Sequence, residues 1–197
     1  MLSSHRLAIA LLFLLDRDEI YWRLTIERGG LLLDHLEGVF NPEDGQSIGV
    51  LVSHGKFRFI DLGDLTWNKE HELACPANKI GTVDLYIVTH HGADLSGPPS
   101  LVHSIQPRVA IMDNGGHKGG SPAAWQTIHR SPGLEDIWQL HYAIEGGKDN
   151  NAPDTFIANT DEVGDVGNWI HVTVRPDGSF TVNNARNKYS KTYAPRG

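Results

Sequence analysis

The stretch DLYIVTHHGADLSGPP, residues 84–99, carries a run of apolar side chains into two adjacent histidines, His90 and His91. Its apolar part is short and continuous, which is typical of a buried strand. The two prolines at its end favour the start of a helix. The stretch therefore predicts a strand, a loop and a helix in succession, with both histidines at the carboxyl end of the strand.

The same alternation of strands and helices continues on both sides of this stretch. A hairpin precedes it, and a second hairpin closes the chain at a Pro-Asp-Gly turn, residues 176–178. The helices have start signals: Thr66 and Ser121 are expected N-caps. Such an order predicts an α/β domain. The expected strands are residues 47–53, 56–62, 83–89, 108–113, 136–143, 155–159 and a hairpin within 168–185, and the expected helices are residues 66–75, 98–105 and 121–129.

Composition excludes several classes of protein. The chain has 197 residues, 40% of them hydrophobic and 21% charged, which suits one globular domain with a sizeable core. Its formal net charge of −7 argues against a nucleic-acid partner, because phosphate neutralisation needs clustered lysine and arginine. Basic residues concentrate only in residues 185–196, which we expect to be a solvated tail. The single cysteine, Cys75, excludes an intramolecular disulfide.

An apolar run in residues 5–15 bears on location. It is too short to span a bilayer, which requires about 20 apolar residues. It also meets the charged residues 16–19 without a small-residue cleavage site. We expect a buried helix or strand here, and a soluble, cytoplasmic protein with no membrane partner.

Polar side chains follow three expected strands. Asp61 and Asp64 follow the first, His90 and His91 the second, and Asp113 with Asn114 the third. In open α/β sheets, ligands bind at the carboxyl ends of strands, so these residues suggest one site. Imidazole and carboxylate are ligands that zinc, manganese or iron would use. The alternative is that Asp64 caps the following helix and the histidines merely end a strand.

Three motifs in this order resemble the C-terminal half of metallo-β-lactamase-fold hydrolases, particularly the branch similar to the hydrolase domain of competence-associated DNA-uptake proteins. The motifs are FRFIDLGDLTWNKE, DLYIVTHHGADLSGPPSLVHSIQPRVAIMDNG and GGSPAAWQTI, within residues 42–185. The resemblance implies a layered αββα sandwich, truncated or remodelled at its N-terminus. Residues 1–40 would be an unmatched segment packing on the core, and residues 41–197 the half-domain.

The resemblance also implies a metal site and a reaction. Asp64 would be the carboxylate shared by metals, and His90 or His91 the terminal ligand. The ion would be zinc or another divalent metal, activating water to hydrolyse an ester-type bond of a small-molecule substrate. Asn114, His117 and Lys118 are the expected substrate-binding residues.

The chain departs from that family in two ways. The His-x-His-x-Asp-His motif is absent, since no two histidines are two positions apart. Gly119 and Gly120 stand where relatives have a histidine before Ser-Pro. We therefore expect an incomplete, weak metal site. Half of a sandwich would also leave an apolar sheet face in water, so we expect residues 1–40 or a second copy of the chain, in a homo-oligomer, to cover it.

Two other functions compete with the metallohydrolase. GQSIG, residues 45–49, matches the Gly-x-Ser-x-Gly pattern of serine esterases, with Ser47 as nucleophile and Asp64 and His90 or His91 as partners. That pattern needs a following helix, whereas a strand is expected here. The second alternative is a non-catalytic remnant that acts in binding or assembly.

Overall fold

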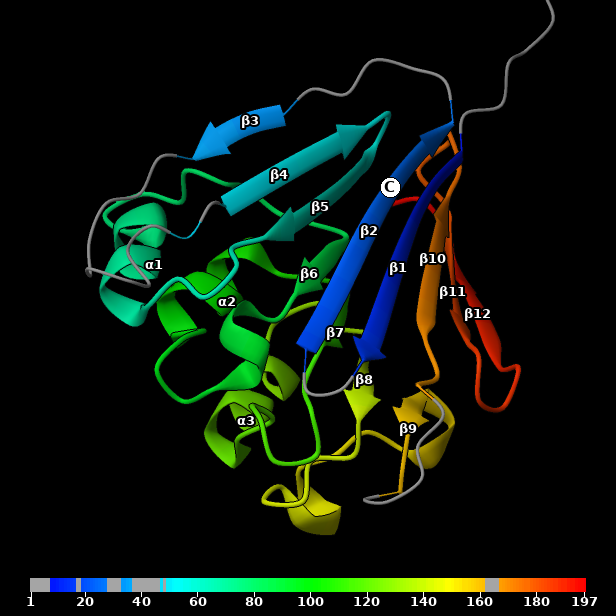
Figure 1. Ribbon diagram of the computed structural model, residues 1–197. Coiled ribbons are helices and arrows are strands. Elements are labelled where there is room, and N and C mark those ends of the chain that lie inside the picture. Colours follow the sequence, from blue (N-terminus) through cyan, green and yellow to red (C-terminus); the bar gives the residue numbers. More distant parts are fainter. Residues whose placement is uncertain (1–7, 17–18, 28–32, 37–46, 48, 162–166) are drawn as a thin grey trace, which may run out of the picture.

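In the residues that it describes, the computed structural model shows two β-sheets packed face to face, with three α-helices on the outer face of the larger sheet (Figure 1). The α/β class expected from the sequence is thus confirmed. The structure describes residues 8–16, 19–27, 33–36, 47, 49–161 and 167–197.

The larger sheet has seven strands in the order β3-β4-β5-β6-β7-β8-β9. Strands β3 to β5 are antiparallel, and β5 to β9 are parallel. Parallel strands bring their carboxyl ends to one edge, which is where the polar loops lie. The strands are β3 (Leu33–Leu36), β4 (Gly49–His54), β5 (Phe57–Asp61), β6 (Leu85–Ile87), β7 (Val109–Met112), β8 (Asp136–His141) and β9 (Ile157–Asn159).

The smaller sheet has five antiparallel strands in the order β12-β11-β10-β1-β2. Strand β1 joins the start of the chain to its end, because Leu11 stands opposite Leu24 on one side and Val172 on the other. The strands are β1 (Ala8–Asp16), β2 (Glu19–Glu27), β10 (Ile170–Val174), β11 (Phe180–Asn184) and β12 (Ser190–Tyr193).

Side chains of the larger sheet alternate between two hydrophobic cores. In β7, Val109 and Ile111 pack between the sheets, while Ala110 and Met112 pack under the helices. The period of two in strand side chains produces this division. The helices α1 (Trp67–Ala74), α2 (Pro99–Ile105) and α3 (Pro122–His129) all contribute to the second core.

Helix starts follow the sequence signals closely. The Ser121 hydroxyl accepts a hydrogen bond from the Ala124 amide, 3.2 Å away, so the expected N-cap of α3 is confirmed. Thr66 occupies the N-cap position of α1 but makes no side-chain capping bond. Among the described residues, no helix is long and apolar enough to cross a membrane.

One sequence expectation about secondary structure is wrong, and another holds only in part. Residues 185–196 are not a solvated tail: β12 pairs with β11, and its Tyr193 is buried against Trp138 with a hydrogen bond of 2.9 Å. The strand expected over residues 83–89 is only three residues long, because a 3₁₀ turn (Thr89–Gly92) replaces its end.

The inner face of the larger sheet is covered within one chain. Residues of β4 to β9 share a core with residues of β10 to β12. The sheet face that was expected to lie exposed, and to be covered by a second copy of the chain, is therefore already packed along these strands. Self-association stays a prediction, but this argument no longer supports it. The N-terminal segment, residues 1–40, was expected to pack on the core; it contributes β1 and β2 to the smaller sheet.

Candidate functional site

A cavity of about 350 Å³ opens at the carboxyl ends of β5, β6 and β7. It brings together four residues singled out in the sequence as catalytic or metal-binding: Ser47, Asp64, His90 and His91. Two strand-end carboxylates, Asp61 and Asp113, also line it, with Gly63, Ile87 and Val88. The three expected polar loops therefore meet in one place.

Both histidines lie on a strained turn. The φ angles of His90 and His91 are 55° and 56°, in the left-handed region, and Gly92 continues at 78°. A left-handed conformation costs a residue other than glycine about 1–2 kcal/mol. The turn is fixed by the His90 amide, which donates to the Gly63 carbonyl at 2.9 Å. Such strain clusters at functional sites, where the surrounding fold enforces it.

His91 lies between two carboxylates. Its Nδ1 is 3.2 Å from Asp113 Oδ2, and its Nε2 is 3.6 Å from Asp64 Oδ1. Burial disfavours the charged imidazole, but the hydrogen bond and charge of Asp113, together with Asp64, outweigh it and raise the pKa of His91. Because Nδ1 donates to Asp113, a neutral His91 presents the lone pair of Nε2 to Asp64. Two acceptors then face each other, an arrangement that favours a proton or a cation between them.

His90 has a defined tautomer. Its Nδ1 lies 3.2 Å from Ser96 Oγ, and the Ser96 hydroxyl donates its hydrogen to the Leu65 carbonyl at 2.6 Å. Ser96 Oγ can therefore only accept from His90, so Nδ1 carries the proton and Nε2 is left as an acceptor. A histidine whose second nitrogen is held in this way is typical of metal ligands and general bases.

Asp61 adds a third carboxylate, largely withdrawn from water. Burial, together with the charge of Asp113, raises its pKa to about 6, against the lowering effect of the Gly63 amide. The Gly63 amide donates to Asp61 Oδ1 at 2.9 Å. Asp113 Oδ1 is buried and has no hydrogen-bond partner within the described residues. The cavity therefore concentrates negative charge and unused acceptor atoms.

Ser47 lines the same cavity but is not held by a base. Its Oγ accepts from the Asp64 amide at 3.2 Å, and no hydrogen bond to an imidazole occurs within the described part of the chain. The strand β4 follows it, rather than the helix that a nucleophile elbow requires.

The three expected substrate-binding residues lie outside the cavity lining. Asn114 is fully buried, and its amide donates to the carbonyls of Gly115 and His141. It therefore braces the loop after β7. His117 and Lys118 are exposed on that loop, although the charge of Lys118 is close enough to lower the pKa of His91 against the effect of its carboxylate neighbours.

The two glycines that replace a family histidine are required by the turn. A Cβ on Gly119 would lie 2.1 Å from the His91 carbonyl oxygen, and one on Gly120 would lie 2.5 Å from Ala143 Cβ. Both have positive φ angles, 70° and 65°. The Gly120 amide donates to the His91 carbonyl at 2.9 Å. This loop thus packs directly on the histidine turn and has no room for another side chain there.

Sequence reasoning missed Glu70, which supports the turn from beneath. Glu70 is fully buried in α1, and its Oε2 accepts from the Gly97 amide at 2.6 Å. Burial raises its pKa to about 7, although the Thr89 hydroxyl and the Gly97 amide lower it. It therefore contacts both ends of the segment that carries the histidines. An acidic residue in the first turn of a helix usually faces water, so the sequence contained no signal for this burial.

Metal-ligating capacity is limited. Within the described ranges, no three histidine, cysteine, aspartate or glutamate side chains are arranged to hold one ion. The donor atoms that remain are Asp64 Oδ1, the facing His91 Nε2 and the lone pair of His90. Of these, Asp64 Oδ1 and His91 Nε2 lie 3.6 Å apart, and this pair falls short of a metal centre with three protein ligands.

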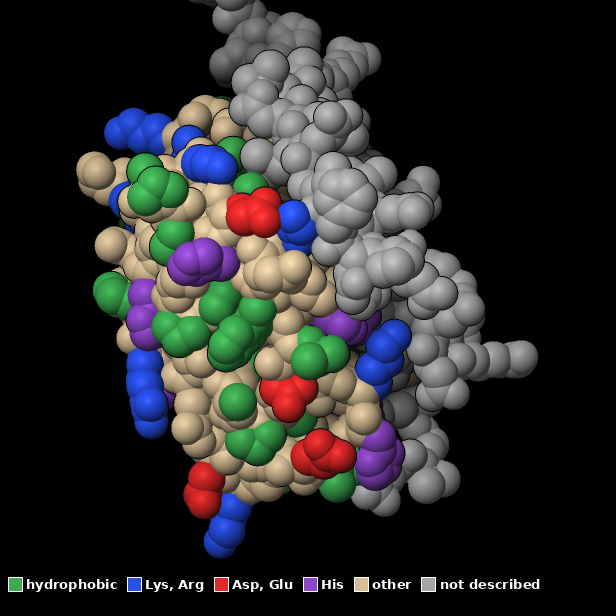
Figure 2. Space-filling view, turned by 90° about the vertical axis from the view of Figure 1, so that its left-hand side faces the viewer, with side chains coloured by type: hydrophobic (Ala, Val, Ile, Leu, Met, Phe, Trp, Pro, Cys, Tyr) green, Lys and Arg blue, Asp and Glu red, His purple; other side chains and the backbone are tan. Residues whose placement is uncertain are grey.

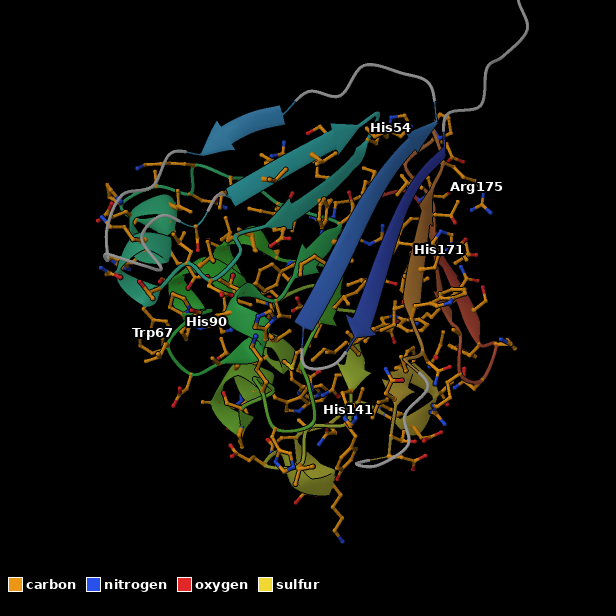
Figure 3. All side chains as sticks on the ribbon, viewed as in Figure 1. His54, Trp67, His90, His141, His171 and Arg175 are labelled. Atoms are coloured by element: carbon orange, nitrogen blue, oxygen red, sulfur yellow. The ribbon has the colours of Figure 1, made fainter. Side chains whose placement is uncertain are left out.

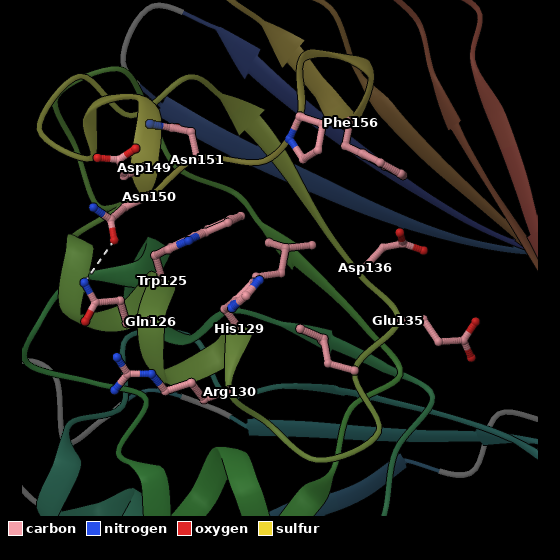
Figure 4. A pocket seen from close by; sticks show the side chains of 13 residues that line it. Trp125, Gln126, His129, Arg130, Glu135, Asp136, Asp149, Asn150, Asn151 and Phe156 are labelled. Atoms are coloured by element: carbon pink, nitrogen blue, oxygen red, sulfur yellow. Dashed lines mark hydrogen bonds between the residues drawn. The ribbon is translucent and has the colours of Figure 1, made fainter.

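A second cavity, of about 750 Å³, lies between α3 and the segment 149–156 (Figure 4). Several of its polar side chains brace the fold. Asn150 accepts from Gln126 at 3.1 Å, and the Asn151 amide donates to the Ala143 and Gly147 carbonyls. We therefore place the candidate site in the smaller cavity.

No family model, curated protein or solved structure matches this chain.

Proposed function

We propose that the chain is a hydrolase that acts on an ester-type bond of a small molecule at the cavity of His90, His91, Asp64 and Asp113. The observation that carries the proposal is His91, held through Nδ1 by Asp113 while Nε2 faces the cavity and Asp64. A buried carboxylate that orients an imidazole is a recurring arrangement of general bases and of metal ligands. The αββα architecture of metallo-β-lactamase-fold hydrolases, reduced to one helical layer, is the fold that we assign to it.

The residues of the cavity have separate roles in the proposed reaction. In the neutral form of His91, Nε2 takes a proton from a water molecule, whose oxygen attacks the carbonyl carbon of the ester. The bond from that carbon to the leaving oxygen then breaks, and the proton passes to the departing alcohol. Asp113 orients the imidazole and stabilises its positive charge, and Asp64 positions the water.

A weakly bound divalent ion fits the same place. Asp64 and His91, with His90 nearby, would hold it, and zinc suits these ligand types. The chemistry that such an ion supplies when bound is acidification of water and stabilisation of the developing oxyanion. A serine esterase is the second candidate, because Ser47 lines the same cavity.

Hydrolysis of p-nitrophenyl acetate and bis(p-nitrophenyl) phosphate, with and without EDTA, tests the proposal. We expect His91→Ala to lower kcat/KM about a hundredfold, the usual contribution of a general base. His71→Ala is the matched control, because His71 is exposed on α1. Equal activity of His91→Ala and wild type would contradict the proposal.

The same assay separates the alternatives. Activity that EDTA removes and zinc restores indicates the metallohydrolase. Activity that survives EDTA but is lost in Ser47→Ala indicates the serine esterase. Metal-free protein that hydrolyses neither substrate, with or without added zinc, indicates a remnant that acts in binding or assembly.

A further inference from the structure

Two large apolar side chains are conspicuously exposed among the described residues. Trp67 is 50% exposed and Leu95 is 61% exposed, and no other large hydrophobic residue of the described part is exposed to this degree. Their backbones are joined, since the Trp67 amide donates to the Leu95 carbonyl at 3.1 Å. Figure 3 labels Trp67 on the same side of the molecule as His90, and Figure 2, which faces that side, shows hydrophobic side chains gathered near its centre.

The apolar pair belongs to the two segments that build the cavity. Residues 63–67 and 90–96 run together, joined by three successive hydrogen bonds: His90 amide to Gly63 carbonyl, Ser96 hydroxyl to Leu65 carbonyl, and Trp67 amide to Leu95 carbonyl. The first of these bonds lies at the cavity and the last lies at the exposed pair. Because three residues span at most about 11 Å, the Trp67 backbone lies within that distance of Asp64.

Half or more of each side chain is open to water, so neither is a core residue. Hydrogen bonds in this region come from other groups: the Thr66 hydroxyl donates to Asn68 Oδ1, and the Trp67 backbone amide donates to the Leu95 carbonyl. Isolated apolar residues on a surface need no explanation, but Trp67 and Leu95 stand on the two segments whose other residues line a polar cavity, and a ligand site usually combines such polar and apolar parts. In such a site, a few polar groups handle the reacting atoms and apolar walls bind the rest of the ligand.

We propose that Trp67 and Leu95 bind the apolar acyl chain of the ester, and that they select substrates with longer chains over acetyl esters. This inference rests on the proposed hydrolase. Binding of the unreactive part of a substrate lowers the barrier of the reaction whenever that contact is retained in the transition state. The polar cavity holds the carbonyl, and the apolar pair holds the chain that extends from it.

A chain-length series tests the selection. In wild type, kcat/KM for p-nitrophenyl acetate, butyrate and octanoate should rise about twofold for each methylene, since full burial of a methylene gives about fourfold and this surface is open on one side. In the double variant Trp67→Ala, Leu95→Ser, the ratio of kcat/KM for octanoate to that for acetate should fall at least about tenfold. Trp169→Ala, which removes a half-buried tryptophan directly before β10, the middle strand of the other sheet, should leave the ratio unchanged.

A binding measurement separates this inference from the proposed reaction. Methyl octyl ketone keeps the carbonyl and the alkyl chain but has no bond to hydrolyse, and saturation-transfer NMR reports its binding without turnover. We expect binding to His91→Ala that is lost when Trp67→Ala and Leu95→Ser are added. Binding without any ester hydrolysis would support the apolar site and refute the hydrolase.

Three results would overturn the inference. One is hydrolysis with a ratio that the double variant does not change. Another is ketone binding that is equal with and without the apolar pair, or absent altogether. The third is that wild type, but not the double variant, sediments with phosphatidylcholine vesicles while both have the same octanoate-to-acetate ratio of kcat/KM. That result would assign Trp67 and Leu95 to binding a lipid surface. Circular dichroism of each variant confirms that it is folded.

Discussion

Glu70 should make the stability of the protein depend on pH in a way that one substitution removes. Its carboxyl is fully buried, and its pKa is raised from 4.5 to about 7. The native state therefore keeps a proton that the unfolded chain releases at lower pH. The contribution of Glu70 to the free energy of unfolding should be highest below pH 4.5. It should fall as the pH rises from 4.5 to 7 and level off above pH 7.

The magnitude follows from the two pKa values. One pKa unit corresponds to about 1.4 kcal/mol, so ionising Glu70 in the folded protein costs about 3 kcal/mol. Glu70→Gln keeps the shape of the protonated acid, and its amide oxygen can still accept from Gly97. Relative to the variant, wild type should therefore lose about 3 kcal/mol of stability between pH 4.5 and pH 8.

Urea unfolding at several pH values from 4.5 to 8.5 measures this difference. Subtracting the two curves removes the contribution of Asp61, whose raised pKa acts in the same direction. Glu72→Gln is the matched control, because Glu72 is exposed on the same helix and forms a surface ion pair with Lys69 at 2.9 Å. Parallel curves for wild type and Glu70→Gln across the whole range would refute the burial of a protonated carboxyl.

Three further outcomes are expected. Gly119→Ala should destabilise the protein by about 3 kcal/mol in urea unfolding, because the added Cβ would overlap the histidine turn. Gly133→Ala, at a residue with a positive φ but open space around it, should cost about 1 kcal/mol. Similar values for the two variants would contradict the close approach of Gly119 to the turn. Tyr193→Phe should lower stability by about 1–3 kcal/mol, since the indole N–H of Trp138 loses its buried partner, and an unchanged urea midpoint would argue against that bond. Zinc at tenfold its Kd should stabilise wild type by about 1.4 kcal/mol, seen as a higher Tm that EDTA reverses, and Asp64→Asn should respond less; an equal response would place the ion elsewhere.

The composition of the site was predictable because it depends on strand ends. Parallel neighbours finish at one edge of a sheet, so the strand ends in FIDLGDL, VTHHG and AIMDNGG bring their carboxylates and histidines into one cavity, although Asn114 stays outside its lining. The pairing of His91 with Asp113 was not predictable, because it depends on a left-handed turn of two consecutive non-glycine residues. Sequence preferences argue against such a turn, and the fold enforces it through Gly63 and Gly119.

The smaller sheet was only partly predictable. Strands β10 and β11 show alternation around a Pro-Asp-Gly turn, and the hairpin was recognised from it. Strand β12 was missed because it is an edge strand in which only Tyr193 is buried, so its hydrophobic signal is weak. Residues 19–27 alternate as a strand does, but nothing local indicates that their hairpin pairs with β10, which lies more than a hundred residues later.

The union of β1 with β10 has a consequence for how the protein is made. The ribosome synthesises β1 and β2 long before β10, so the edge of β1 that later pairs with β10 stays unpaired during most of synthesis. During that interval the inner face of the larger sheet also lacks β10, β11 and β12. Chains with unpaired strand edges and uncovered apolar faces tend to aggregate, and strands that are far apart in sequence pair slowly. Assembly of this domain therefore ends with a single late closure, and a nascent chain arrested before residue 170 should depend on chaperones that the finished protein does not need.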